Sequence, residues 1–166
     1  VGSIWGFIES FAGGIGDAAE IRVAYHLGNN HPHLSKLSAY KSMLIAMVCT
    51  VVLVIIALCI MDRVPYWFTV DETLEELIGG VLPYIIVGTI PAVFGSQCWY
   101  MVGAQGRYKI ATWVSFGTSF GITVPLAAIF TFVFNYNLQG LGSAMVIGYT
   151  AMGIVMAGML LGSDWV

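Results

Sequence analysis

Carboxylic acids within an apolar segment are the first residues of this sequence that could do chemistry. Glu9 lies inside "VGSIWGFIESFAGG", and Glu20 follows it eleven residues later. At about 100° per residue, that spacing is three helical turns plus roughly 20°, so both acids would share one helix face. Gly13 and Gly16 lie near the same line and would leave room for water or a ligand. An ionisable group in such a setting predicts an ion-coupling site, whereas the alternative for Glu20 is an ion pair with a nearby basic residue such as Arg22.

The histidines are gathered in one segment. "RVAYHLGNNHPHLSK", residues 22–36, holds His26, His31 and His33. Imidazoles could gather a transition metal, but this segment has no cysteine or carboxylate to complete a ligand set. A polar turn between two membrane spans is the other interpretation, and we favour it. We therefore expect no bound metal and no cofactor.

Three polar side chains interrupt a long apolar stretch later in the chain. Thr89, Ser96 and Gln97 could form hydrogen bonds with a substrate in a cavity, or with a neighbouring helix. The sequence leaves both alternatives open. It predicts these three residues as candidates for a substrate cavity.

Residues 14–17, "GIGD", resemble the G-x-G-D motif of presenilin-type intramembrane aspartyl proteases. That chemistry requires two carboxyl groups that share one proton. The Pro-Ala-Leu motif that accompanies it in those proteases is absent downstream. Asp17 as a catalytic residue is therefore the weakest of the alternatives.

Composition assigns the chain to the membrane. Hydrophobic residues make up 58% and charged residues 9%, against roughly 45–50% and roughly 25% in soluble domains. Residues 43–61 contain Thr50 as their one polar side chain and are long enough to cross a bilayer as a helix. We predict an all-α, multi-pass protein with spans at about 1–25, 43–61, 77–104, 110–134 and 138–162.

The basic residues predict the orientation of these spans. Five of the six fall in two connections on the same side: Arg22, Lys36, Lys41, Arg107 and Lys109. Arg63 is on the other side. The excess of Lys and Arg in cytoplasmic loops therefore places residues 26–42, residues 105–109 and the carboxyl end in the cytoplasm. The membrane would be the plasma membrane or a vacuolar-type membrane.

The segment "AAEIRVAYHLGNNHPHLSK" resembles a loop of the multidrug and toxic compound extrusion (MATE) transporters. The matching residues are Ala18, Ala19, Arg22, Val23, Leu27, Gly28 and Lys36. Weaker matches follow in the family's order along the chain: Phe68, Thr69, Asp71, Pro83, Gly106, Lys109, Gly140, Leu141, Ser163, Asp164 and Trp165. The final Asp-Trp pair favours the C-terminal lobe, with Arg22, Leu27 and Gly28 in its family-motif loop.

This resemblance implies a secondary transporter and not an enzyme. It implies export of organic, often cationic, compounds in exchange for H⁺ or Na⁺ by alternating access. The protein would be embedded in the lipid bilayer, and we expect no nucleic acid as a partner. Residues 1–166 would be part of a six-helix lobe, lacking its first helix and the whole N-terminal lobe. Ala92 occupies a position where many eukaryotic members have an acid, so a non-transporting or degenerate helical membrane protein remains the alternative.

Overall fold

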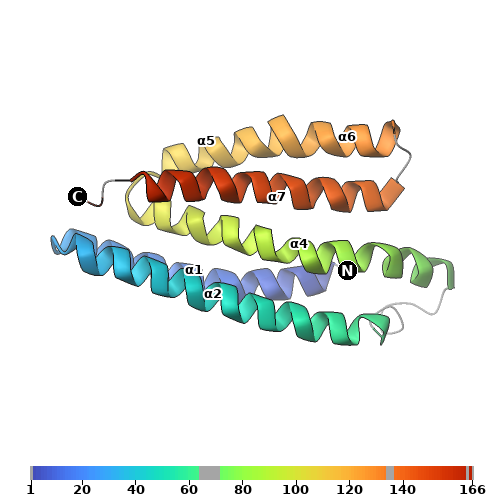
Figure 1. Ribbon diagram of the computed structural model, residues 1–166, viewed down its shortest axis with the longest axis horizontal. Helices are drawn as coiled ribbons and strands as arrows, with labels where there is room; N and C mark the ends of the chain where they lie inside the picture. The colour runs from blue at the N-terminus through green and yellow to red at the C-terminus, as the bar shows by residue number, and fades with distance from the viewer. Residues whose placement is uncertain (1, 64–71, 134–136, 164, 166) are drawn as a thin grey trace.

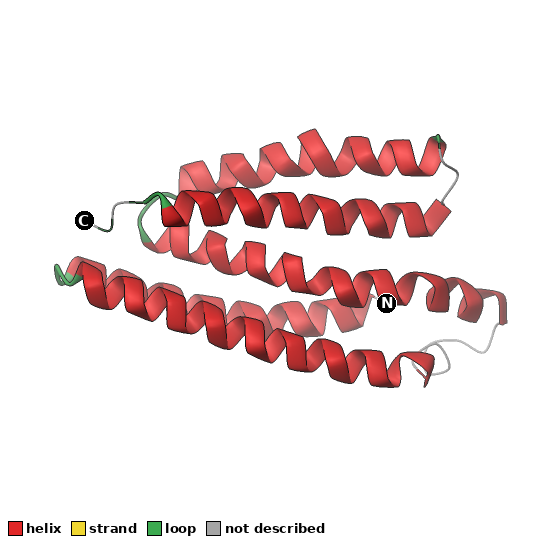
Figure 2. Cartoon of the chain, in the orientation of Figure 1, coloured by secondary structure: helices red, strands yellow, loops and turns green. Residues whose placement is uncertain are grey.

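The computed structural model describes residues 2–63, 72–133, 137–163 and 165, and all regular structure within them is helical (Figure 2). The elements are α1 (Gly2–Gly28), α2 (Pro32–Ile60), the 3₁₀ turn η1 (Met61–Arg63), α4 (Glu72–Ala104), α5 (Tyr108–Thr118), the π turn η2 (Ser119–Thr123), α6 (Val124–Phe132) and α7 (Asn137–Leu161). The predicted all-α fold is confirmed. The motif residues Phe68, Thr69, Asp71 and Asp164 lie outside the described residues.

Four helices of the described chain are long and apolar enough to cross a membrane. They are Pro32–Ile60, Ile78–Ala104, Tyr108–Phe132 and Gln139–Leu161. The first predicted span has the expected helical form as α1, but α1 is not among these four. Its acids, its Arg22 and its glycines lower its hydropathy, so its passage through the membrane remains a prediction.

The connection predicted between the first two spans is much shorter than residues 26–42. α1 continues to Gly28 and α2 begins at Pro32. The end of α1 is a Schellman turn, in which the His31 N–H donates to the His26 carbonyl at 2.9 Å and the Asn30 N–H to the Leu27 carbonyl at 3.0 Å. Asn30 has the left-handed φ of 59° that this turn requires. Pro32 then starts the next helix, where its missing N–H costs no hydrogen bond.

The turn between α4 and α5 has the same construction. The Arg107 N–H donates to the Val102 carbonyl and the Gly106 N–H to the Gly103 carbonyl, while Gly106 has a φ of 75°. In Figure 1 both turns and the carboxyl end of the chain lie at one end of the bundle. The two turns, towards which five of the six basic residues lie in sequence, are therefore at the same end of the bundle, and the side of the membrane that they face stays a prediction.

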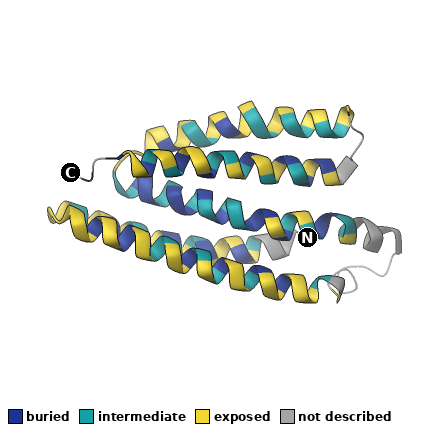
Figure 3. Cartoon of the chain, viewed as in Figure 1, coloured by how far each residue is buried: buried dark blue, intermediate teal, exposed yellow. Residues whose placement is uncertain are grey.

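Helix α4 is the centre of the bundle. It packs against α1 and α2 on one side and α7 on the other, and α5 and α6 pack against α7 (Figure 1). Figure 3 shows that the half of α4 nearer the two turns is mostly buried or intermediate, whereas α2 and α5–α6 are broadly exposed. A core near the two Schellman turns joins side chains from five helices: Ala19, Val23, Ala39, Cys98, Met101, Val102, Ala111, Met156 and Leu160. A second core joins α2 to α4 through Val54, Ala57, Leu82 and Ile86.

Candidate functional site

The acids of α1 lie beside the face that packs against α4. Ala12, Gly16, Ala19 and Val23 form a buried line at helical spacing. Their small size lets the two helices approach closely, which is how helices associate in lipid. Residues that flank this line are less buried, and one flank carries every acid of α1.

Tyr100 of α4 lies against this acidic flank. Its ring fills the space over Gly16, where an added Cβ would come within 2.6 Å of Tyr100 Cε2. At Gly13 an added Cβ would be 3.5 Å from the Tyr100 hydroxyl oxygen. That hydroxyl forms a hydrogen bond with the Asp17 carboxylate. The room that the sequence predicted beside the acids is therefore occupied by an aromatic ring from a neighbouring helix.

The other two acids act on the same ring or on a second tyrosine. Glu20, which is half-buried, interacts electrostatically with both Asp17 and Tyr100. Glu9 is exposed and interacts electrostatically with Tyr100 and with Tyr149 of α7. The structure thus places the two predicted coupling candidates on one flank of α1 with Asp17, about three helical turns apart, and within electrostatic reach of two tyrosines. We call these five residues the acid–tyrosine face.

The tyrosines were missed by the sequence reasoning. Tyr100 and Tyr149 are distant from α1 along the chain. Tyr100 is on α4, which packs against α1, and Tyr149 is on α7, which packs against the other side of α4. The glycines Gly13 and Gly16 were the available signal, since a gap in a helix surface beside acids indicates close approach by another group. Their neighbour could not be named without the helix order.

The three predicted cavity residues of α4 occupy different settings. The Thr89 hydroxyl donates to the Ile85 carbonyl at 2.9 Å, and the Ser96 hydroxyl to the Val93 carbonyl at 2.9 Å, so both bond within their own helix. Gln97 is fully buried, and its Nε2 donates to the Ala12 carbonyl of α1 at 2.7 Å. Its amide therefore joins α4 to α1, and contact of these three residues with substrate stays a prediction.

The family-motif residues lie on the last turns of α1. Leu27 supplies a carbonyl to the Schellman turn and Gly28 ends the helix. Arg22 is exposed on the flank of α1 that borders a groove beside α2. Arg22 is therefore separate from the acid–tyrosine face, which is on the other flank of α1.

The histidines are spread over two helices and a turn. His26 belongs to α1 and His33 to α2, while His31 lies between them with its Nδ1 2.6 Å from the Asn29 carbonyl oxygen. Within the described residues, no three His, Cys, Asp or Glu side chains gather in a way that could hold a metal ion.

Taken with its composition, this bundle of membrane-length helices defines a multi-pass helical membrane protein. The MatE family model matches residues 1–129, which is more than half of the chain. The chain therefore belongs to the MatE family, and the sequence resemblance to these transporters is confirmed.

Curated relatives extend the match across almost the whole chain. Protein DETOXIFICATION 29 of Arabidopsis thaliana is 24% identical over 98% of this chain and 33% of its own length. Protein DETOXIFICATION 17 of the same plant is 27% identical over 92% of this chain and 32% of its length. The chain thus spans about a third of the length of the curated relatives it matches.

The fold is that of a solved transporter. The crystal structure of the eukaryotic MATE transporter AtDTX14 aligns with a TM-score of 0.92 at 19% identity, covering 98% of this chain and 36% of that one. At this identity the likeness establishes the fold. It also extends to the carboxyl-terminal helix, which the family model does not reach.

Proposed function

We propose that this chain forms most of the C-terminal lobe of an exporter that exchanges organic, often cationic, compounds for H⁺ or Na⁺ by alternating access. Membership of the MatE family supports transport over catalysis. The acid–tyrosine face supports ion exchange in particular, because the carboxylates of Glu9, Asp17 and Glu20 on α1 interact electrostatically with tyrosines of α4 and α7. The first helix of this lobe and an N-terminal lobe would complete the protein.

The chemistry of this face suits an organic cation. Carboxylates attract positive charge, and tyrosine rings attract cations over their faces at roughly 0.5–2 kcal/mol. Protonation or Na⁺ binding at the same carboxylates would neutralise them and weaken their hold on the substrate. Ion and substrate would then compete, and each would shift the balance between lobe conformations through its different affinity for the two states.

Glu9 is the residue to which we assign ion coupling. It is exposed on the acid–tyrosine face and interacts with tyrosines of both α4 and α7. Ala92 leaves α4 without a carboxylate at the position where many family members have one. We therefore assign ion coupling in this lobe to α1, with Glu20 as a second candidate nearer the turns.

The test is pH- or Na⁺-driven efflux of a cationic dye from vesicles that contain the full-length protein. Glu9→Gln should abolish the dependence of efflux on the ion gradient, because an amide cannot exchange a proton or bind Na⁺ as a carboxylate does. Glu9→Asp is the matched variant and should keep gradient-driven efflux at a reduced rate. Unchanged coupling in Glu9→Gln, at equal protein abundance, would remove Glu9 from the mechanism.

A second candidate function follows from Ala92. A lobe without the usual acid on α4 is also what a non-transporting or degenerate family member would have. That alternative predicts no gradient-driven dye flux from the unmodified protein. Asp17 as a protease residue finds no support, since the group of α4 that it interacts with is the Tyr100 hydroxyl and not a second carboxyl group, and the family is one of transporters.

We also propose that the two Schellman turns and the carboxyl end face the cytoplasm, in a plasma or vacuolar-type membrane. Both turns lie at one end of the bundle (Figure 1), which is consistent with the five basic residues that the sequence places there. Labelling of a single cysteine introduced at Asn29 from the two sides of sealed vesicles would test this orientation.

A further inference from the structure

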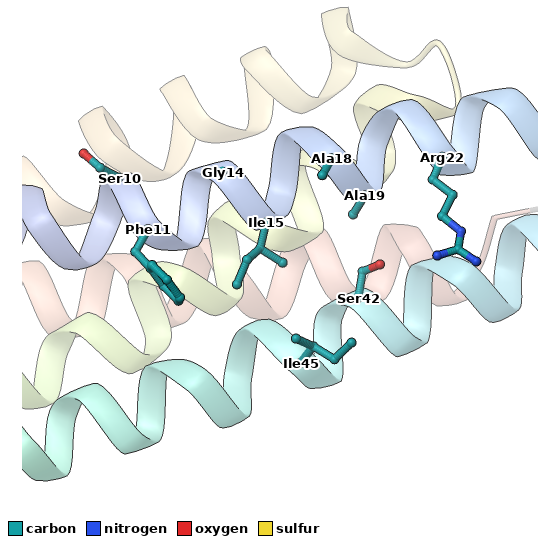
Figure 4. A pocket seen from close by; sticks show the side chains of 9 residues that line it. All are labelled: Ser10, Phe11, Gly14, Ile15, Ala18, Ala19, Arg22, Ser42 and Ile45. Atoms are coloured by element: carbon teal, nitrogen blue, oxygen red, sulfur yellow. The ribbon is translucent and has the colours of Figure 1, made fainter.

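A groove runs between α1 and α2 on the flank opposite the acids (Figure 4). Its volume is about 580 Å³. Gly14 and Ala18 form part of the α1 side, and an added Cβ at Gly14 would meet no atom within 4 Å. The larger apolar side chains that line it are Phe11, Ile15 and Ile45. The groove therefore has an apolar lining and free space over its small residues.

One end of the groove is cationic. Arg22 lines it on α1, near the Schellman turn (Figure 4). Lys41 precedes the lining residue Ile45 by four positions on α2, so the two share a helix face, with Lys41 one turn nearer the same end. Both cations are exposed. They come from separate helices and flank the end that the charge distribution predicts to be cytoplasmic.

The groove has no acidic residue in its lining. The carboxylates of α1 are on its other flank, beside Tyr100 and Tyr149. An anion at Arg22 and Lys41 would thus meet two cations and no carboxylate of the lining. An apolar chain attached to that anion could continue along Ile45, Ile15 and Phe11 towards the membrane interior.

We propose that this groove is a binding site for one anionic phospholipid, with its phosphate at Arg22 and Lys41 and an acyl chain along the apolar walls. Basic pockets between membrane helices on the cytoplasmic side bind anionic headgroups in this way. The charge pattern distinguishes such a lipid from a neutral one, because a zwitterionic headgroup gains less from two adjacent cations. The site is independent of the acid–tyrosine face and of the transport proposed above.

Native mass spectrometry of the full-length protein in detergent, titrated with an equimolar mixture of phosphatidylserine and phosphatidylcholine, tests the proposal. The unmodified protein should retain phosphatidylserine in preference. Arg22→Gln and Lys41→Gln should each lower the bound ratio of the two lipids by about fivefold, the factor that corresponds to roughly 1 kcal/mol per cation near an anionic surface. Both side chains are exposed, so neither substitution removes core packing.

Two further variants make the result specific to the groove. Lys109→Gln removes an exposed cation at the start of α5, away from the groove, and should leave the ratio unchanged. Gly14→Leu keeps every charge but fills the groove, and should reduce retention of phosphatidylserine. The proposal is overturned if the double variant Arg22→Gln with Lys41→Gln still prefers phosphatidylserine, or if Lys109→Gln lowers that preference equally. It is also overturned if Gly14→Leu retains as much phosphatidylserine as the unmodified protein. It is also overturned if Gly14→Leu instead separates a dimer, which would make a second copy the occupant.

Discussion

Helices α2 and α4 show that the most apolar helix is not the core of this molecule. The mean hydropathy of the most apolar window is 3.2 in α2 and 1.8 in α4, yet 17% of that window is buried in α2 and 39% in α4. In water the order would be reversed, because the more apolar helix would gain more from burial. In lipid this driving force is absent between helices, and close packing decides which surfaces meet.

The side chains of α2 follow the same rule. Its buried residues are small or polar, with Val54 the largest: Ser35, Ser38, Ala39, Ala46, Thr50, Val54 and Ala57. Large aliphatic residues such as Val52, Ile55 and Ile56 are on its exposed side. The central helix α4, by contrast, buries Leu82, Ile86 and the amide of Gln97. Hydrophobicity therefore marks the lipid surface here, and size and hydrogen bonding mark the interior.

The largest effect expected from this comparison is at Leu82, which is fully buried between α4 and α2. Leu82→Ala should lower the free energy of unfolding by about 2 kcal/mol, the low end of the range for such cavities, because lipid is as apolar as the core and only packing is lost. Unfolding of the full-length protein in mixed micelles of a mild detergent and dodecyl sulfate would measure it. Ile55→Ala on the exposed side of α2 should lower the free energy of unfolding by less than about 0.5 kcal/mol. Equal losses in Leu82→Ala and Ile55→Ala would contradict the difference between the two helices.

A smaller effect is expected at Gly16, where α1 meets α4. Gly16→Ala should destabilise by about 1–2 kcal/mol, because the new methyl group would overlap the Tyr100 ring. Gly14→Ala is the matched control two residues away, where the added Cβ meets nothing within 4 Å. The same unfolding assay should separate the two variants. If neither substitution changes the free energy of unfolding, Tyr100 does not pack closely over Gly16.

The smallest effect concerns the hydrogen bond from Gln97 to the Ala12 carbonyl. Gln97→Met keeps the volume and removes the bond, and should cost about 0.6 kcal/mol, the average for hydrogen bonds between membrane helices. Thr89→Val removes a hydroxyl that bonds within its own helix and should cost less. A larger loss in Thr89→Val would show that polar groups of α4 matter for something other than joining helices.

Much of the fold could be predicted from the sequence because lipid allows few structures. Apolar length predicted helices, and the distribution of Lys and Arg predicted which connections lie together. The segment 26–42 was predicted to be a connection because Ser35, Lys36 and Lys41 are polar. In the structure it is mostly helix, and the Ser35 hydroxyl donates a hydrogen bond to the Val23 carbonyl of α1 at 3.0 Å.

The candidate site was predicted in part for a similar reason. The eleven-residue spacing of Glu9 and Glu20 is a property of one helix, and the structure places both on the acidic flank. Their tyrosine partners depend on how three helices pack, which no local pattern encodes. Gln97 shows the same limit, because a polar residue in a span predicts a hydrogen bond without predicting its partner.

The π turn η2 carries a consequence for the evolution of the α5–α6 span. The Val124 N–H donates to the Ser119 carbonyl five residues earlier, so this turn contains one residue more than a turn of α-helix. Deleting one codon there would restore a regular helix and rotate α6 by about 100° relative to α5. Phe132, now exposed, would turn towards a different neighbour. A single deletion could thus turn a different side of α6 towards its neighbours in one mutational step.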